Sequence, residues 1–232
     1  MWSSVRRLVR RSLWTVTPRD HREAATAFRR RQVVTLAAGV VGAGVLAWSL
    51  RIEPGNAWFY PATLTLAAVW TMGAFASGPL HLGRIGVREP RPRPVLEPVL
   101  LGLAVAATFV VGALVVREVP GLADQVREVL QHARQGSGPL VLLSTVAVGI
   151  SEELFFRGAA YAAIPRHPVP VTTALYVLAT AVTGNLMLIF AALVLGIVVG
   201  LQRRASGGVM APVLTHVTWS VVMLYALPAI FL

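Results

Sequence analysis

The stretch PLVLLSTVAVGISEELFFRGAAYAAI, residues 139–164, decides the fold. It is almost entirely apolar and exceeds the roughly 20 apolar residues with which a helix crosses the hydrocarbon core of a bilayer. Three ionisable residues nevertheless interrupt it: Glu152, Glu153 and Arg157. A charge at the bilayer centre costs at least about 2.5–3.5 kcal/mol on insertion scales, so such groups face a bundle interior or water. The stretch therefore predicts a membrane helix that carries a polar site.

Composition places the whole chain in the membrane class. Hydrophobic residues make up 56% of it and charged residues 13%, whereas a soluble domain carries about 25% charge. The absence of cysteine excludes disulfides, thiolate metal sites and a thiol nucleophile. The net charge of +11 comes from arginines clustered between apolar runs, a pattern that the positive-inside rule explains better than nucleic-acid binding. We expect the lipid bilayer as a partner and no nucleic acid.

Periodic and apolar segments predict an all-α, polytopic membrane helical bundle of about seven transmembrane helices, preceded by an N-terminal basic amphipathic segment. The fifth and sixth predicted spans are short and separated only by Gly184 and Asn185, which predicts a tight helical hairpin. The seven predicted spans are residues 33–50, 57–77, 95–116, 139–164, 169–184, 186–202 and 209–231.

The chain divides into three parts. Residues 1–32 hold nine arginines and, as a helix, would have one apolar face. This combination predicts that the segment lies on an anionic cytoplasmic leaflet. Residues 33–138 contain the N-terminal transmembrane helices and an outer amphipathic helix, and residues 139–232 contain the core helices that carry the ionisable groups. The residues of the two apolar faces are Trp2, Val5, Leu8 and Val9 in the first part, and Leu122, Val126, Val129 and Leu130 in the outer helix.

The arginine distribution predicts the orientation. With a cytoplasmic N-terminus, sixteen of the 21 arginines fall in segments on the cytoplasmic side and four on the other, with Arg157 inside the membrane. Basic residues accumulate in cytoplasmic loops. We therefore expect a multi-pass protein of the cell membrane with its N-terminus in the cytoplasm and its C-terminus outside.

The charged residues of the fourth span separate into a pair and a single carboxylate. Glu153 and Arg157 are four residues apart on a helix and can pair. Glu152 points about 100° away by the helical repeat, so it needs a partner on another helix or must stay protonated and neutral. The alternative to a catalytic role is a structural one, in which Glu152, Glu153 and Arg157 form a packing network that orients the helices.

The last span offers the partner in the segment APVLTHVTWS, residues 211–220. His216 and Ser220 are four residues apart and share a helical face. Counted from the cytoplasmic ends of their spans, Glu152 and His216 lie about 18 Å and 10 Å deep at the rise of an α-helix. Both therefore fall in the cytoplasmic half of the bilayer, where His216 can meet Glu152.

These residues resemble a known family. The pattern Glu-Glu-x-x-x-Arg of residues 152–157, the Leu-Gly-x-x-x-Gly of residues 195–200 and the late SGGVMAPVLTH of residues 206–216 are similar to the CPBP group of intramembrane proteases. That group contains the CAAX prenyl endopeptidases and bacterial relatives of the Abi type linked to bacteriocin processing and immunity. The resemblance covers about residues 139–231, which it identifies as a catalytic core.

The resemblance implies a glutamate-driven hydrolase inside a helical bundle. It makes Glu152 the base that polarises the attacking water, with Glu153 and Arg157 orienting it. It makes His216 a residue that holds the water or stabilises the transition state, and it places Ser220 where the family has an asparagine or aspartate for the oxyanion. A preorganised donor in a closed pocket strengthens the stabilisation of a developing negative charge.

Two departures from the family bear on this hypothesis. Residues 178–185 read LATAVTGN and lack the family's second histidine, so Thr180 or Thr183 would have to supply a hydrogen bond there. Ser220 is also shorter than asparagine.

The same departures count against a metal, although the family is often labelled as metalloproteases. A catalytic zinc ion takes three protein ligands, and this chain offers only Glu152, Glu153 and His216 at that depth. We expect no cofactor and disfavour zinc.

Three function classes stay open at this point. The first is a CAAX-protease-like intramembrane endopeptidase that uses a glutamate-activated water near the cytoplasmic side and acts on a membrane-associated peptide or protein. The second is a catalytically impaired CPBP-fold protein that acts in binding, immunity or as a scaffold. The third is a small-solute transporter with Glu152 or Glu153 as its proton site, which the lack of a detectable repeat argues against.

Overall fold

The computed structural model describes residues 10–18, 23–84 and 95–232, with only the main chain at His132. Every regular element in these residues is helical, which confirms the all-α prediction. The elements are η1 (Arg10–Trp14), α2 (Ala25–Ser49), α3 (Phe59–Ser77), α4 (Leu96–Val116), α5 (Pro120–Arg134), α6 (Gly138–Glu152), η2 (Glu153–Ala160), α7 (Tyr161–Ala163), α8 (Pro168–Ala181), α9 (Leu186–Ser206) and α10 (Met210–Phe231).

Six helices of the described chain are long and apolar enough to cross a membrane, with α6, η2 and α7 counted as one rod over Gly138–Ala163. They coincide with six of the seven predicted spans. The first begins at Ala25 rather than at residue 33, because the arginine-rich turn that precedes the apolar run is helical too. The predicted span at residues 169–184 forms the 14-residue helix α8, which at 1.5 Å per residue is about 21 Å long and shorter than the roughly 30 Å hydrocarbon core.

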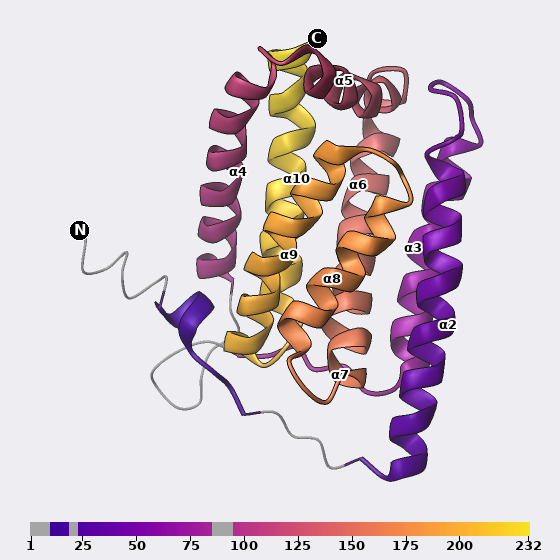
Figure 1. Cartoon of the computed structure of the whole chain (residues 1–232), viewed down its shortest axis with the longest axis vertical. Coiled ribbons are helices and arrows are strands. Elements are labelled where there is room, and N and C mark those ends of the chain that lie inside the picture. Colours follow the sequence, from indigo (N-terminus) through magenta and orange to yellow (C-terminus); the bar gives the residue numbers. More distant parts are fainter. Residues whose placement is uncertain (1–9, 19–22, 85–94) are drawn as a thin grey trace.

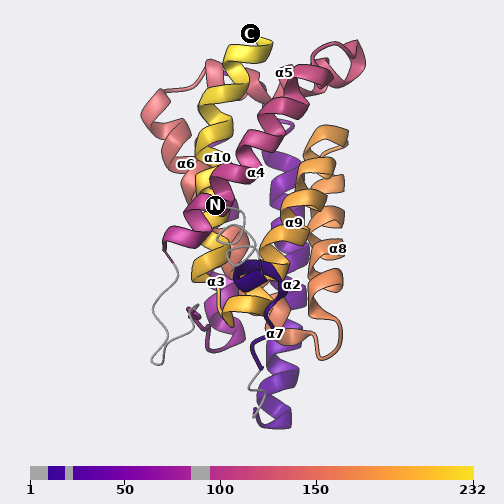
Figure 2. The same ribbon diagram turned by 90° about the vertical axis from the view of Figure 1, so that its left-hand side faces the viewer.

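The helices pack as neighbouring pairs around the central rod. α2 contacts α3, α4 contacts α10, and α8 contacts α9, while the rod formed by α6 and η2 touches α3, α10 and α8. Figure 1 shows α2 and α3 along one side of the bundle and α4 along the other, with α8 and α9 in front of α6. The view turned by 90° in Figure 2 shows α8 and α9 side by side, so the two short-linked segments form the predicted helical hairpin.

Aromatic side chains form the apolar core beside the rod. Trp70 of α3 is 1% exposed and packs on Phe155 and Phe156 at ring distances of 6.1 and 5.4 Å. Gly42 of α2 makes room for the indole, since a Cβ there would lie 1.9 Å from Trp70 Nε1. This packing fixes the rotation of η2 about its axis and thereby the direction of its charged side chains.

Large apolar side chains also cover the outside of the bundle. Leu36, Val111 and Leu178 are 70%, 64% and 64% exposed and belong to three different helices. A soluble monomer rarely leaves so much apolar surface uncovered. Together with six apolar helices of spanning length, this surface identifies a multi-pass membrane protein.

The outer amphipathic helix is present as α5, which lies across one end of the bundle (Figure 1). Val126 and Leu130 of its predicted apolar face are buried and pack, with Ala123, against Ala113 of α4 and Phe231 of α10. Leu122 and Val129 of the predicted face are only partly buried. The apolar stripe is therefore centred on Ala123, Val126 and Leu130.

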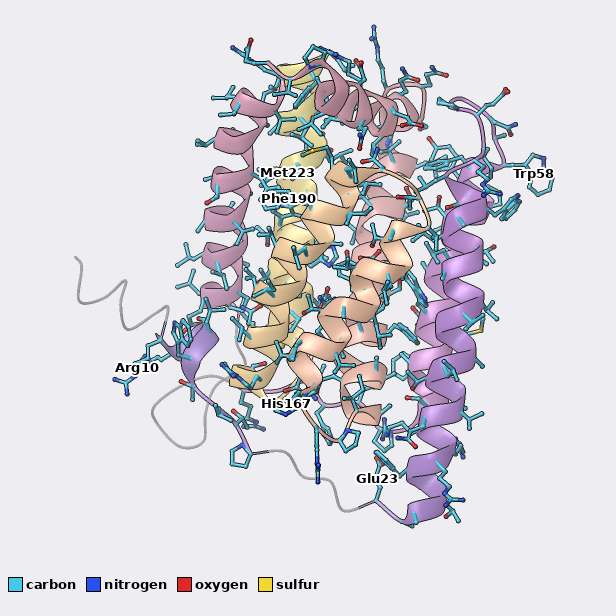
Figure 3. All side chains as sticks on the ribbon, viewed as in Figure 1. Arg10, Glu23, Trp58, His167, Phe190 and Met223 are labelled. Atoms are coloured by element: carbon cyan, nitrogen blue, oxygen red, sulfur yellow. The ribbon has the colours of Figure 1, made fainter. Side chains whose placement is uncertain are left out.

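The opposite end of the bundle gathers arginines. Figure 3 labels Arg10, Glu23 and His167 at that end and Trp58 at the other. The predicted apolar face of Trp2, Val5, Leu8 and Val9 lies outside the described residues. The neighbouring segment that is described packs against the end of α9, where Thr17 N–H donates to the Arg204 carbonyl at 3.0 Å.

Candidate functional site

The carboxylates lie where the central rod changes its helical type. α6 ends at Glu152, and η2, a π-helical segment, begins at Glu153. Backbone hydrogen bonds from residue i to i+5 put more residues into each turn, so successive side chains are separated by a smaller angle than in an α-helix. Such segments are rare and frequently occur at functional sites. Glu152 and Glu153 both lie near His216 of α10, at 3.7 and 2.7 Å.

Glu153 lies at the centre of a buried hydrogen-bonded group. Its Oε1 accepts a hydrogen bond from Arg157 Nη1 at 3.1 Å, which confirms the predicted pair, and both side chains are 0% exposed. The same oxygen lies 2.7 Å from Nδ1 of His216 in α10. A carboxylate can accept from both donors, so Nδ1 donates to Glu153 and the second ring nitrogen, Nε2, points away from it.

Glu152 is the more accessible of the two carboxylates. Its side chain is 12% exposed, against none for Glu153. The phenol of Tyr176 in α8 donates to Glu152 Oε2 at 2.6 Å. His216 Nε2 lies 3.7 Å from the same oxygen, which is too far for a hydrogen bond but close enough for one water molecule to touch both groups.

Sequence reasoning paired His216 with Glu152, and the structure places the ring within ion-pair distance of that carboxylate, 3.7 Å from Oε2. The histidine does enter the site at the expected depth, but its direct hydrogen bond is to Glu153. His216 therefore lies close to both carboxylates and bonds the more buried one.

Arg157 is fixed by contacts on three sides. Besides Glu153, its Nη2 donates to the Gly196 carbonyl at 3.3 Å, and its guanidinium lies 4.8 Å from the Tyr176 ring centroid. Gly196 belongs to the Leu-Gly-x-x-x-Gly motif, and a Cβ there would lie 3.1 Å from Thr173 Cγ2 and 3.3 Å from Arg157 Nη2. The motif thus brings α9 close enough to accept a hydrogen bond from the buried arginine.

Three further predicted residues form no hydrogen bond with the carboxylates. Ser220 lies one turn after His216, is partly buried, and forms no hydrogen bond with any described residue. Thr180 donates to the Tyr176 carbonyl of its own helix at 2.9 Å, and Thr183 accepts from the Asn185 N–H at 3.2 Å. Neither threonine takes the place of the family's second histidine.

Sequence reasoning missed Tyr176, the residue of α8 that does reach the site. A signal was present, because Tyr176 and Thr180 are four residues apart on one face of an apolar helix. A buried tyrosine hydroxyl usually finds a hydrogen-bond partner. The unassigned carboxylate of Glu152 was the partner that such a hydroxyl could have been expected to bind.

The metal prediction concerns the same three side chains, Glu152, Glu153 and His216. Within the described parts of the chain, no three His, Asp or Glu side chains are placed to hold an ion. Glu153, one of the three predicted ligands, already bonds the Arg157 guanidinium and the His216 ring. The positive charge of the Arg157 guanidinium beside Glu153 opposes the binding of a cation there. No chemical step below involves a metal.

Comparison with known proteins supports the resemblance seen in the sequence. Residues 134–222 match the family model described as type II CAAX prenyl endopeptidase Rce1-like. Neither a search of curated proteins nor a search of solved structures found a match. The matched region contains Glu152, Glu153, Arg157, Tyr176, His216 and Ser220. The region of the chain that holds the site, residues 134–222, is therefore similar to the Rce1-like CAAX prenyl endopeptidases, consistent with the CPBP resemblance of its motifs.

Proposed function

We propose that the chain hydrolyses a peptide bond with a water molecule activated by Glu152, on the side of the membrane that carries the arginine-rich end. The match of residues 134–222 to a family model of endopeptidases supports the reaction class. The observation that carries the mechanism is the difference between the carboxylates: Glu152 keeps 12% exposure, while Glu153 is buried against Arg157 and His216. Water can reach the first and not the second.

The proposed reaction follows the usual course of a base-assisted hydrolysis. Glu152 takes a proton from the water as its oxygen bonds to the carbonyl carbon of the substrate. His216 Nε2, 3.7 Å from Glu152 Oε2, helps to hold this water. The proton then passes from Glu152 to the leaving nitrogen as the carbon–nitrogen bond breaks. A general base positioned in this way contributes about 10²–10⁴-fold to the rate.

The other residues maintain the geometry of the base and the histidine. Glu153 accepts from His216 Nδ1 and so fixes the ring orientation that presents Nε2 to Glu152. Arg157 balances the charge of Glu153 in a region without solvent. Ser220, free of other hydrogen bonds among the described residues, lies one turn from His216 and is the proposed donor to the developing oxyanion.

The depth of the site supports cleavage near one membrane surface. His216 lies six residues after Met210, the start of α10, which is about 9 Å at the helical rise. That end of the bundle also carries Arg10 and His167 (Figure 3). By the arginine count it is the cytoplasmic end, and we propose that the substrate is cut there.

The test uses purified protein in liposomes and a quenched fluorescent peptide with a farnesylated Cys-a-a-X end, chosen from the family description. Wild-type protein is expected to cut the peptide into two products identified by mass spectrometry. Glu152→Ala should slow this by about 10²–10⁴-fold, whereas Glu128→Ala, an exposed glutamate of α5, should not change it. Equal cleavage by wild type and Glu152→Ala would refute the assigned base.

One observation favours a second candidate, a catalytically impaired protein that acts in binding, immunity or as a scaffold. The Thr180 hydroxyl is engaged with its own helix, so no side chain of residues 178–185 contacts the carboxylates. Replacing Thr180 by histidine tests this candidate. A large gain of cleavage over an inactive wild type would support impairment, and wild-type cleavage that disappears in His216→Ala would exclude it.

A further inference from the structure

Tyr176 is a buried hydroxyl group that the proposed mechanism has not yet used. It is 7% exposed, lies on α8, and donates a hydrogen bond of 2.6 Å to Oε2 of Glu152. A short bond from a hydroxyl to a carboxylate is typical of charge-assisted hydrogen bonds, which are stronger than neutral ones. Glu152 is therefore held by a side chain from a helix other than its own.

We propose that Tyr176 is a positioning residue that donates to one lone pair of Glu152 Oε2 and so fixes the carboxylate beside His216 Nε2, where the attacking water binds. This proposal rests on the proposed function of Glu152. It assigns to Tyr176 the polar contact from α8 to the catalytic base, two residues before the segment 178–185 in which the family resemblance expected a second histidine.

The surroundings of Tyr176 suit such a role because they fix the ring. The Arg157 guanidinium lies 4.8 Å from its centroid on one side, and the Phe156 ring lies at 4.9 Å. Gly196 of α9 makes room for it, since a Cβ there would lie 3.4 Å from Tyr176 Cδ1. A hydroxyl on a ring held by three helical segments can restrict Glu152 to one rotamer and one orientation of the carboxyl plane.

Other polar side chains of α8 do not compete for this role. The Thr180 and Thr172 hydroxyls donate to carbonyls of their own helix, and Thr173 Oγ1 is buried without a partner among the described residues. Removing a hydrogen-bond partner that orients a catalytic group typically costs about 10–100-fold in activity. Loss of the Tyr176 hydroxyl should therefore lower kcat by about that factor and leave KM nearly unchanged.

The experiment compares Tyr176→Phe with Tyr60→Phe on the farnesylated quenched peptide in liposomes. Tyr60 is a matched control because its phenol oxygen is also buried but has no hydrogen-bond partner among the residues that the structure describes. The expected result is a fall in kcat of about 10–100-fold for Tyr176→Phe alone, with KM within about twofold. An unchanged kcat, or a change confined to KM, would overturn the proposal.

A second readout separates this proposal from the proposed function. Dicyclohexylcarbodiimide modifies accessible carboxyl groups in membrane proteins, and mass spectrometry measures its addition to Glu152 without any substrate. Tyr176→Phe should expose Oε2 and speed the labelling of Glu152 several-fold relative to wild type and Tyr60→Phe. Equal labelling would overturn the positioning role, whereas absence of peptide cleavage by wild type would refute only the proposed function.

Unnatural analogues serve if Tyr176→Phe does not fold. 4-Aminophenylalanine at position 176 keeps the ring and a hydrogen-bond donor, and 4-methylphenylalanine keeps the size without the donor. Slow Glu152 labelling with the first and fast labelling with the second would support the proposal. The same labelling rate with both would contradict it.

Discussion

The buried pair of Glu153 and Arg157 makes the stability of this bundle depend on one arginine. In Arg157→Met the side chain keeps most of its length but loses a 3.1 Å bond to Glu153, a 3.3 Å bond to the Gly196 carbonyl and a contact with the Tyr176 ring. Glu153, 0% exposed, would keep His216 as its one hydrogen-bond partner. Removing one partner of a buried ion pair costs about 3–5 kcal/mol, because it leaves an uncompensated charge.

The assay is the free energy of unfolding, measured by titration with sodium dodecyl sulfate in lipid bicelles. A loss of about 3–5 kcal/mol corresponds to a fall in Tm of roughly 6–20 °C for a chain of this size. The double variant Glu153→Gln/Arg157→Met removes both charges and should be less destabilised than the sum of the single variants, by about 1–3 kcal/mol. That coupling isolates the pair from lost packing.

Arg117→Met is the control for an exposed pair. Arg117 bonds Glu118 at 2.8 Å, but their side chains are 49% and 70% exposed. Exposed ion pairs contribute little to stability, so this variant should unfold like wild type. The reasoning would be refuted if Arg157→Met lost less than about 1 kcal/mol, or if the two arginine variants behaved alike.

Three further predictions concern the site and its support. His216→Gln should lower kcat at least about tenfold, because it removes the ring held against the base. The Tm of this variant, measured in parallel, should stay near that of wild type. Unchanged turnover would exclude His216 from the reaction. Gly196→Ala should reduce the free energy of unfolding, because its Cβ would lie 3.1 Å from Thr173 Cγ2. The control Gly44→Ala meets open space and should raise the free energy of unfolding by up to about 1 kcal/mol through helix propensity. A change of the same sign in both variants would contradict the packing argument. Dialysis against a strong zinc chelator should leave turnover within about twofold, and activity lost to the chelator and restored by zinc would show that a metal takes part.

Much of the fold could be predicted because it depends on local and periodic features of the sequence. Apolar runs bounded by arginine, glycine and proline marked six spans and the α8 helix, and the four-residue spacing of Glu153 and Arg157 predicted their pairing. The depth of His216 followed from counting residues along two helices. These quantities need only the chain itself and the helical rise.

The contacts that could not be predicted depend on how neighbouring helices are rotated about their axes. The hydrogen bond from His216 to Glu153 and that from Tyr176 to Glu152 join different helices. Both depend on how α10 and α8 are turned toward the rod, which no composition or period in residues 149–158 predicts. The packing of Trp70 on Phe155 and Phe156 then fixes the rotation, and these rings are far apart in sequence.

The role of Glu152 as the base is tested most directly by Glu152→Gln, which keeps the shape of the side chain and an oxygen to accept from Tyr176. The measurement is the single-turnover rate on the farnesylated quenched peptide, with peptide binding measured separately on the same protein. The mechanism predicts unchanged binding and a rate reduced by about 10²–10⁴-fold. Cleavage by Glu152→Gln within tenfold of the wild-type rate would contradict it.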